Sequence, residues 1–171
     1  REWLLIASWG ASSQSDAFLI SLFLPEALRM ALAAGLISAA ALPLYQERGE
    51  TEQRQWLGAM APRFLLTRVA ISLLFSLAAP LWVRLIGPGL SIEAHSQAVD
   101  NLKLLAWCAP GFILHALFSV PLQARSRFIL AGFGSLLFNL PAVTYLALYG
   151  QAALPQNVAK CCALGSLLMP I

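Results

Sequence analysis

The sequence predicts an all-α fold, a polytopic bundle of transmembrane helices. The first observation is composition: 59% of the 171 residues are hydrophobic and only 11% are charged, more apolar surface than a soluble domain of this length buries. The second is that four stretches reach the roughly 20 mostly apolar residues that a membrane span requires. The third is that most charged residues fall between these stretches. Lipid is therefore the expected solvent for most of the chain.

The expected segments follow one another with short connections. They are 1–10, 15–44, 64–86, 102–122, 128–149 and 158–171. The first and last are partial, reading as the end of one helix and the start of another. Because the chain begins with Arg1 rather than Met and stops within an apolar segment, we expect 1–171 to be a fragment of a single helical lobe of a longer protein.

The first complete span, 15–44, is too long for a straight crossing. At 1.5 Å per residue it would be about 45 Å long, against a hydrocarbon core of roughly 30 Å. It must tilt or bend, and Pro25, which removes one backbone hydrogen bond, predicts a kink just before Arg29.

The loops predict an orientation. The connections 46–55 and 124–127 contain arginines, whereas 87–101 contains no Lys or Arg. By the positive-inside rule the two arginine-containing loops face the cytoplasm.

The first span also contains charges. Each charge near the bilayer centre costs roughly 2.5 to 3.5 kcal/mol on an insertion scale, so such residues usually pair or line a pathway. Glu26 and Arg29, three positions apart on a helix, can neutralise one another; alternatively, Arg29 faces a wet cavity and binds an anion, exchanging Glu26 for it. Asp16, near the outer end, can cap a helix, pair with a basic residue elsewhere or gate the cavity.

Other polar residues are expected to have structural roles. His115 is expected to be a hydrogen-bonded packing residue, Asn139 to satisfy a carbonyl freed by Pro141, and Arg63 and Arg68 to anchor a helix end. The three cysteines lack the spacing of a zinc or disulfide framework and are expected to be buried thiols.

Several functional classes are disfavoured. The sequence has no Gly-rich phosphate loop, no nucleophile with an evident base and no metal-ligand spacing, so we expect neither an enzyme nor a cofactor or metal site. The net charge of +3 is spread along the chain, which argues against a nucleic-acid partner.

Several short sequence motifs between residues 1 and 149 occur in the same order as in a known protein family. They are Arg1-Glu2, Asp16-Ala17-Phe18, Leu24-Pro25-Glu26-Ala27-Leu28-Arg29 and Pro43-Leu44-Tyr45. With them the chain resembles the MviN/MurJ family of lipid II flippases, in the exporter superfamily that also contains oligosaccharide-lipid flippases and drug antiporters. It departs from the family pattern at Glu2, Met30 and Ala34, where the family usually has Asp, Arg and Glu.

The resemblance implies part of the N-terminal lobe of a MATE-like two-lobe transporter. Such a protein would flip a polyprenyl-pyrophosphate-linked saccharide, lipid II or a related cell-envelope precursor, across the bacterial inner membrane by alternating access. The expected substrate-binding residues are Arg1, Asp16, Glu26 and Arg29, with the two guanidinium groups holding the pyrophosphate. The implied partners are this lipid, membrane lipid and cell-envelope biosynthesis proteins. The alternatives are an exopolysaccharide lipid carrier, a MATE-like drug or cation antiporter, and a structural membrane scaffold.

Overall fold

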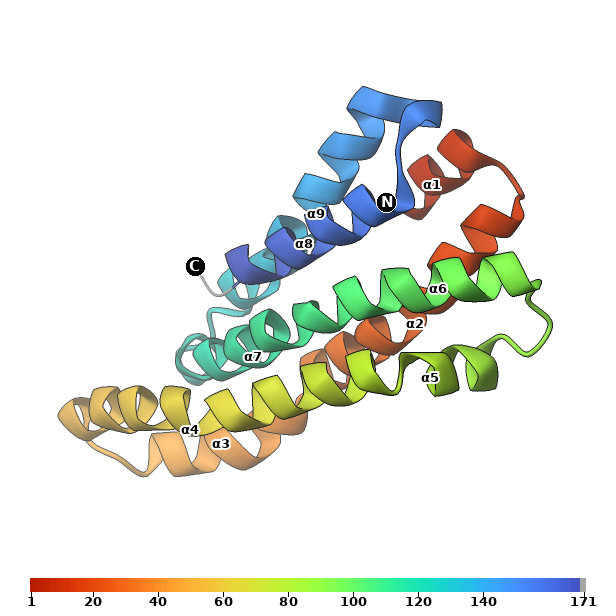
Figure 1. Ribbon diagram of the computed structural model, residues 1–171. Coiled ribbons are helices and arrows are strands. Elements are labelled where there is room, and N and C mark those ends of the chain that lie inside the picture. The colour runs from red at the N-terminus through yellow and green to blue at the C-terminus, as the bar shows by residue number, and fades with distance from the viewer. Residues whose placement is uncertain (170–171) are drawn as a thin grey trace.

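Helices connected by short turns account for nearly all of the structure, a computed structural model that describes residues 1–169 (Figure 1). No strand occurs in that part of the chain. The α-helices are α1 (Glu2–Trp9), α2 (Ser13–Ala33), α3 (Leu36–Gln46), α4 (Glu50–Leu77), α5 (Ala79–Ile86), α6 (Ile92–Leu105), α7 (Ala109–Ala124), α8 (Phe128–Tyr149) and α9 (Pro155–Leu168). Two 3₁₀ turns, η1 (Ala106–Cys108) and η2 (Gly150–Ala152), follow α6 and α8.

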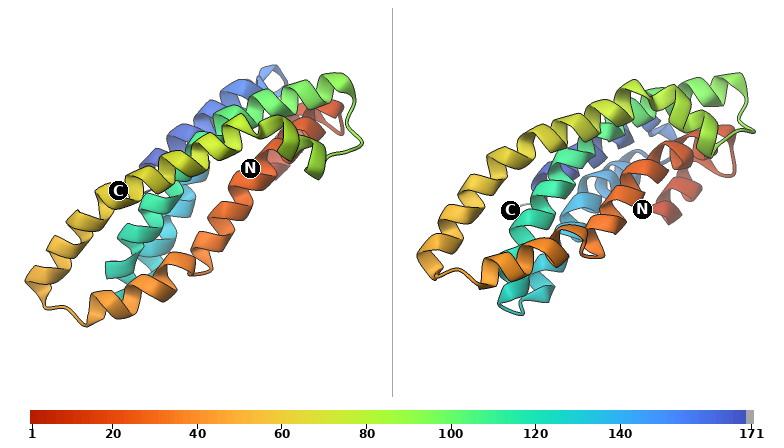
Figure 2. Two further views of the ribbon diagram at one scale, coloured as in Figure 1. Left: turned by 60° about the horizontal axis from the view of Figure 1, so that its bottom comes forward. Right: turned by 90° about the horizontal axis from the view of Figure 1, so that it is seen from below.

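The chain runs back and forth between the two ends of an elongated bundle. The α3–α4 and α7–α8 turns lie at one end, and the α1–α2, α5–α6 and α8–α9 connections lie at the other (Figures 1 and 2). Both arginine-containing turns, with Arg48 and with Arg125 and Arg127, are therefore at the same end, as the predicted orientation requires. The expected cytoplasmic loops share one face of the membrane in this arrangement.

Four helical runs are long and apolar enough to cross a membrane, which makes the chain a multi-pass membrane protein. They are Ser13–Gln46, Glu50–Leu77, Ile92–Ala124 and Phe128–Ala152. In the third run, 61% of the most apolar 18-residue stretch is buried, against 11% in α4. The continuous run α6–η1–α7 is thus the central helix, and α4 lies at the periphery.

Two helices begin earlier than the sequence analysis expected. The span expected at 64–86 is α4 followed by α5, and the charged connection 46–55 becomes helix from Glu50 because Glu50 and Glu52 favour a helix N-terminus. Likewise the span expected at 102–122 starts at Ile92, where the Ser91 hydroxyl accepts a hydrogen bond from the backbone N–H of Ala94 at 3.2 Å. Polar helical turns extend both spans.

The remaining segments lie near their expected places. α1 falls within 1–10, and α8 occupies the residues expected for the span 128–149. α9 starts at Pro155, before the expected 158, and ends at Leu168; residues 170 and 171 of that expected segment lie outside the described residues.

The long first span is interrupted at Gly35, a position that the sequence analysis did not predict. α2 continues through Pro25 to Ala33, and Gly35 adopts φ 101°, a left-handed conformation that starts α3 in a new direction (Figure 2). Residues with a Cβ rarely adopt this φ. Pro25 is tolerated because it removes a single backbone hydrogen bond from a helix that tertiary contacts also hold.

Two glycines allow α9 to approach its neighbours closely. A Cβ on Gly165 would lie 2.2 Å from the backbone oxygen of Phe138 in α8, and one on Gly111 in α7 would lie 2.1 Å from the backbone oxygen of Ser166. Close approach through small residues is typical of helices packed in a membrane. The position of α9 between α7 and α8 depends on these two residues.

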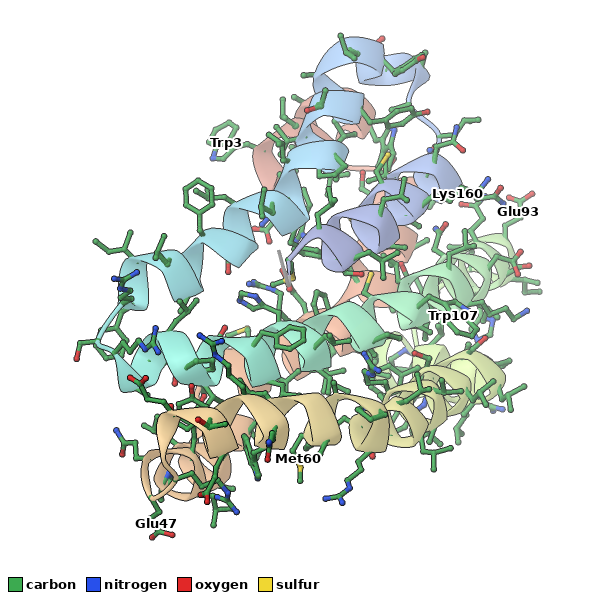
Figure 3. All side chains as sticks on the ribbon, turned by 90° about the vertical axis from the view of Figure 1, so that its left-hand side faces the viewer. Trp3, Glu47, Met60, Glu93, Trp107 and Lys160 are labelled. Carbon is green, nitrogen blue, oxygen red and sulfur yellow. The ribbon has the colours of Figure 1, made fainter. Side chains whose placement is uncertain are left out.

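Large apolar side chains cover the outside of the bundle. Trp3, Leu66, Leu77 and Ile129 are each at least 79% exposed, and Trp3 projects away from the helices in Figure 3. So large an apolar exterior fits contact with lipid or with further protein. The buried core is formed mainly by Phe18, Phe112, Phe138, Leu105, Leu146 and Val158.

Substitution of the glycines beside α9 should destabilise the bundle. We expect Gly111→Ala and Gly165→Ala each to lower stability by about 1–3 kcal/mol, the range for overpacking a close contact, because the added methyl group meets rigid backbone. Gly58→Ala in α4 is the matched control, since a Cβ there meets nothing within 4 Å. Thermal unfolding of the complete protein in detergent measures the effect; equal melting temperatures for all three variants would contradict the packing argument.

Candidate functional site

Three of the four expected site residues form one charged cluster. Glu26 accepts hydrogen bonds through both carboxylate oxygens: Oε1 from Arg1 Nη2 at 2.9 Å, and Oε2 from Arg29 Nε at 2.5 Å. Glu26 and Arg29 lie one turn apart on α2, whereas Arg1 lies at the start of α1. The ion pair expected between Glu26 and Arg29 is therefore present, and a second guanidinium shares the carboxylate.

Helix α8 completes the cluster with residues from its middle. Asn139 Oδ1 accepts a hydrogen bond from Arg1 Nη1 at 3.2 Å, and Ser135 Oγ accepts one from Arg29 Nη1 at 3.4 Å. The carbon at the centre of each guanidinium lies 5.7 Å from the centroid of the Phe138 ring, within the range of a cation–π interaction. One helical turn of α8 thus contacts both arginines.

The two arginines differ in burial. The Arg1 side chain is 5% exposed, while those of Glu26 and Arg29 are each 22% exposed. Arg1 Nε is buried and has no hydrogen-bond partner among residues 1–169. Two positive charges and one carboxylate leave the cluster with a net charge of about +1.

Arg29 also lines a pocket of about 210 Å³ between α2, α3, α7 and α8. Its polar lining comes from Ser38, His115, Ser119, Gln123 and Ser135, and its apolar lining includes Phe112 and Phe128. Gln123 and Phe128 lie beside the α7–α8 turn, so the pocket extends from the cluster toward the predicted cytoplasmic end. Arg29 is therefore neither directed into lipid nor sealed in packed side chains.

Asp16 is separate from this cluster. It lies in the first turn of α2, ten residues and roughly 15 Å along the helix from Glu26. It is exposed and borders a different hollow with Leu19, Gly87 and Leu90. The capping residue of α2 is Ser12, whose hydroxyl accepts a hydrogen bond from the Ser15 backbone N–H, so the capping role considered for Asp16 belongs to Ser12.

The other polar residues are held by backbone groups. His115 Nδ1 donates to the backbone oxygen of Met169 at 2.9 Å. Asn139 Nδ2 donates to the backbone oxygen of Ser135 at 2.8 Å; this carbonyl is one turn before Asn139, so Asn139 does not satisfy the carbonyl freed by Pro141, which would be that of residue 137. Cys108 and Cys162 are buried and Cys161 is half-buried, all as free thiols.

Sequence reasoning missed the contribution of α8. Asn139 and Ser135, in an apolar span, were the available signal, because they lie four positions apart and so on one face of a helix. Phe138 gave no signal, since one aromatic residue in an apolar span is indistinguishable from core. No pattern indicated that this face of α8 meets α1 and α2.

The fold and the cluster together define a class: a polytopic α-helical membrane protein with paired guanidinium groups near the middle of a span. Comparison with known proteins narrows the class. The sequence model described as "Lipid II flippase MurJ" matches residues 6–168. The chain belongs to this family, which confirms the resemblance and the all-α transmembrane fold.

Individual relatives agree with this assignment. The chain is 29% identical over 169 residues to the "Probable lipid II flippase MurJ" of Aquifex aeolicus, covering 95% of this chain and 33% of that protein. It is 28% identical over 120 residues to the "Lipid II flippase MurJ" of Thermosipho africanus, covering 70% of this chain and 25% of that protein. A solved structure titled "Lipid II flippase MurJ, inward closed conformation" matches with a TM-score of 0.82 and 25% identity, over 98% of this chain and 36% of the other.

The chain therefore spans between a quarter and about a third of the length of the relatives it matches. The printed names of the family and of these relatives describe a flippase, which is a transporter and not a catalyst. Among the described residues, no group of three or more His, Cys, Asp or Glu is arranged to hold a metal ion.

Loss of the Asn139 amide should destabilise the charged cluster. We expect Asn139→Leu to cost about 1–3 kcal/mol of stability, the range for leaving buried hydrogen-bonding groups unsatisfied, because Arg1 loses an acceptor. Thr144→Val is the matched control on α8, since the Thr144 hydroxyl is exposed and donates only to the Leu140 carbonyl. Thermal unfolding of both variants of the complete protein checks this; a control as destabilised as Asn139→Leu would rule out a special role for Asn139.

Proposed function

We propose that the complete protein flips lipid II, or a closely related polyprenyl-pyrophosphate-linked saccharide, across the bacterial inner membrane by alternating access. Residues 1–171 would form part of its N-terminal lobe. The family and the solved structural relative support this, since both are named for lipid II flippases. They favour this function over an exopolysaccharide carrier or a MATE-like drug or cation antiporter.

The observation that carries the proposal is the pair of guanidinium groups beside the middle of a candidate membrane span, one of them lining a pocket. Arg29 is the seventeenth residue of the 34-residue run Ser13–Gln46. A pyrophosphate is the part of the substrate least soluble in the bilayer interior, because moving a charge into a low-dielectric medium is costly. Arginine offers a permanent charge and a planar fork of donors suited to phosphate oxygens.

The arrangement of the cluster suggests separate roles for its residues. Arg29, 22% exposed and beside the pocket, would make the first contact with the pyrophosphate. Arg1, held by Asn139 and Glu26, would supply a second positive charge from a fixed position. Glu26 would offset part of the charge and orient both side chains. Asp16 would act at the outer end, away from the phosphate.

Removal of the Arg29 guanidinium should abolish transport without preventing insertion. We expect Arg29→Ala to accumulate in the membrane and to lose at least 90% of the flipping rate, measured with lipid II in proteoliposomes containing the complete protein. Arg63→Ala is the control, because Arg63 is exposed on α4. Mass spectrometry of lipids that co-purify with the wild type should detect a polyprenyl-pyrophosphate saccharide. Full transport by Arg29→Ala would reject the anion-binding role.

Neutralisation of Asp16 should leave phosphate binding unchanged. Asp16 lies roughly 15 Å from Glu26 along α2 and borders a different hollow from Arg29, so it does not touch an anion bound at Arg29. We expect Asp16→Asn to change the Kd for farnesyl diphosphate by less than twofold while slowing lipid II flipping, if the outer end gates the cavity. The two measurements separate the roles: a large increase in Kd would place Asp16 in the phosphate site, and unchanged flipping would remove it from the mechanism.

A further inference from the structure

We infer that Glu26 is an internal competing anion: its carboxylate occupies the Arg29 donors that the substrate phosphate must take, and returns to them when the substrate leaves. The inference rests on the proposed function, since it concerns the same arginines. It goes further by stating that Glu26 lowers the affinity of Arg29 for the substrate and so favours its release.

The contacts of Glu26 resemble those of a bridging phosphate. Each carboxylate oxygen accepts a hydrogen bond from a different guanidinium, Oε1 from Arg1 at 2.9 Å and Oε2 from Arg29 at 2.5 Å. Carboxylates and phosphates are both bound by arginine through short, charge-assisted hydrogen bonds. A substrate phosphate beside Arg29 therefore competes for the same N–H groups.

Among residues 1–169, Glu26 is the principal acidic group of the cluster. Helices α7, α8 and α9 contain no Asp or Glu. Glu2 Oε1 lies 3.8 Å from Arg1 Nη2, farther than Glu26 Oε1 at 2.9 Å, and its only ion pair in the described part of the chain is with Arg1. The charge of Arg29 is thus balanced mainly by one carboxylate on its own helix.

The exchange can occur at Arg29 without disturbing Arg1. Arg29 and Glu26 are each 22% exposed and Arg29 lines the pocket, whereas the Arg1 side chain is 5% exposed. A ligand entering the pocket reaches Arg29 first. When it displaces Oε2, the Oε1 contact can still neutralise Arg1, so Glu26 need not leave the cluster.

This competition would favour release. A carboxylate tethered one turn away is present at a high effective concentration, so it lowers the apparent affinity of any diffusing anion for Arg29. Two guanidiniums without a competitor would hold a pyrophosphate tightly. A transporter must also let its substrate go on the far side, and the returning carboxylate offsets the loss of the phosphate contact.

The test compares Glu26→Gln with the wild type, using the complete protein in lipid nanodiscs and farnesyl diphosphate as the probe. Glutamine keeps the shape of the side chain and removes its charge. We expect Glu26→Gln to bind the probe at least fivefold more tightly and to release it more slowly. Glu2→Gln is the matched control, because it removes an equal charge near Arg1, and its Kd should change less than twofold.

The outcomes separate this inference from the proposed function. Equal or weaker binding by Glu26→Gln would overturn the inference and leave Glu26 as a positioning residue. Farnesyl diphosphate binding that does not change in Arg29→Gln would overturn the anion site itself. Tighter binding by Glu26→Gln that persists in the Glu26→Gln, Arg29→Gln double variant would show that the gain arises elsewhere, which also overturns the inference.

A second variant covers the case in which Glu26→Gln fails to accumulate. The side chain in Glu26→Asp is one methylene shorter and cannot keep both guanidinium contacts in place. We expect at least twofold tighter binding of farnesyl diphosphate, with a larger ligand-induced rise in melting temperature than in the wild type. Unchanged or weaker binding would overturn the inference here too.

Discussion

One carboxylate shared by two guanidinium groups is the interaction on which the rest of this structure depends. Arg1, Glu26 and Arg29 come from α1 and α2, and α8 surrounds them with Ser135, Phe138 and Asn139. Breaking a buried ion pair by removing one partner costs about 3–5 kcal/mol, because the other charge is left uncompensated. In a bilayer this penalty discourages the three helices from separating. The cluster that we propose to bind substrate is therefore also a structural element of the lobe.

The hydrophobic core contacts this charged cluster through Phe138. The Phe138 ring lies 5.0 Å from that of Phe112 in an edge-to-face arrangement, and each guanidinium lies 5.7 Å from the Phe138 centroid. The backbone oxygen of Phe138 is also the atom against which Gly165 packs. This part of α8 is thus fixed by α7, by α9 and by the arginines together. A site so placed can hold its donors in position before an anion arrives, which lowers the ordering cost of binding.

The sequence predicted the transmembrane bundle and the Glu26–Arg29 pair, because apolar run length and three-residue spacing are local signals. It did not predict that α4 starts at Glu50 and α6 at Ile92. The residues that extend these helices beyond their apolar parts are polar, and they give only a weak local signal. The sequence also did not predict the interruption of the first span at Gly35, since only the backbone angle of that glycine shows where the direction changes. The contacts of Asn139 and Ser135 with the two arginines could not be predicted, because pairings over 138 and 106 positions leave no local pattern.

Gly35 has a consequence for the space beside Arg29. Leu32 and Ala33 precede it, Ser38 follows it, and all three border the pocket. The two half-spans are joined there by a residue whose backbone rotates with little steric resistance. Turning that one joint would widen or narrow the chamber while leaving every hydrogen-bonded turn of α2 and α3 intact. The angle set at this one glycine would thus determine the volume available to a headgroup, with the helical hydrogen bonds of both half-spans kept.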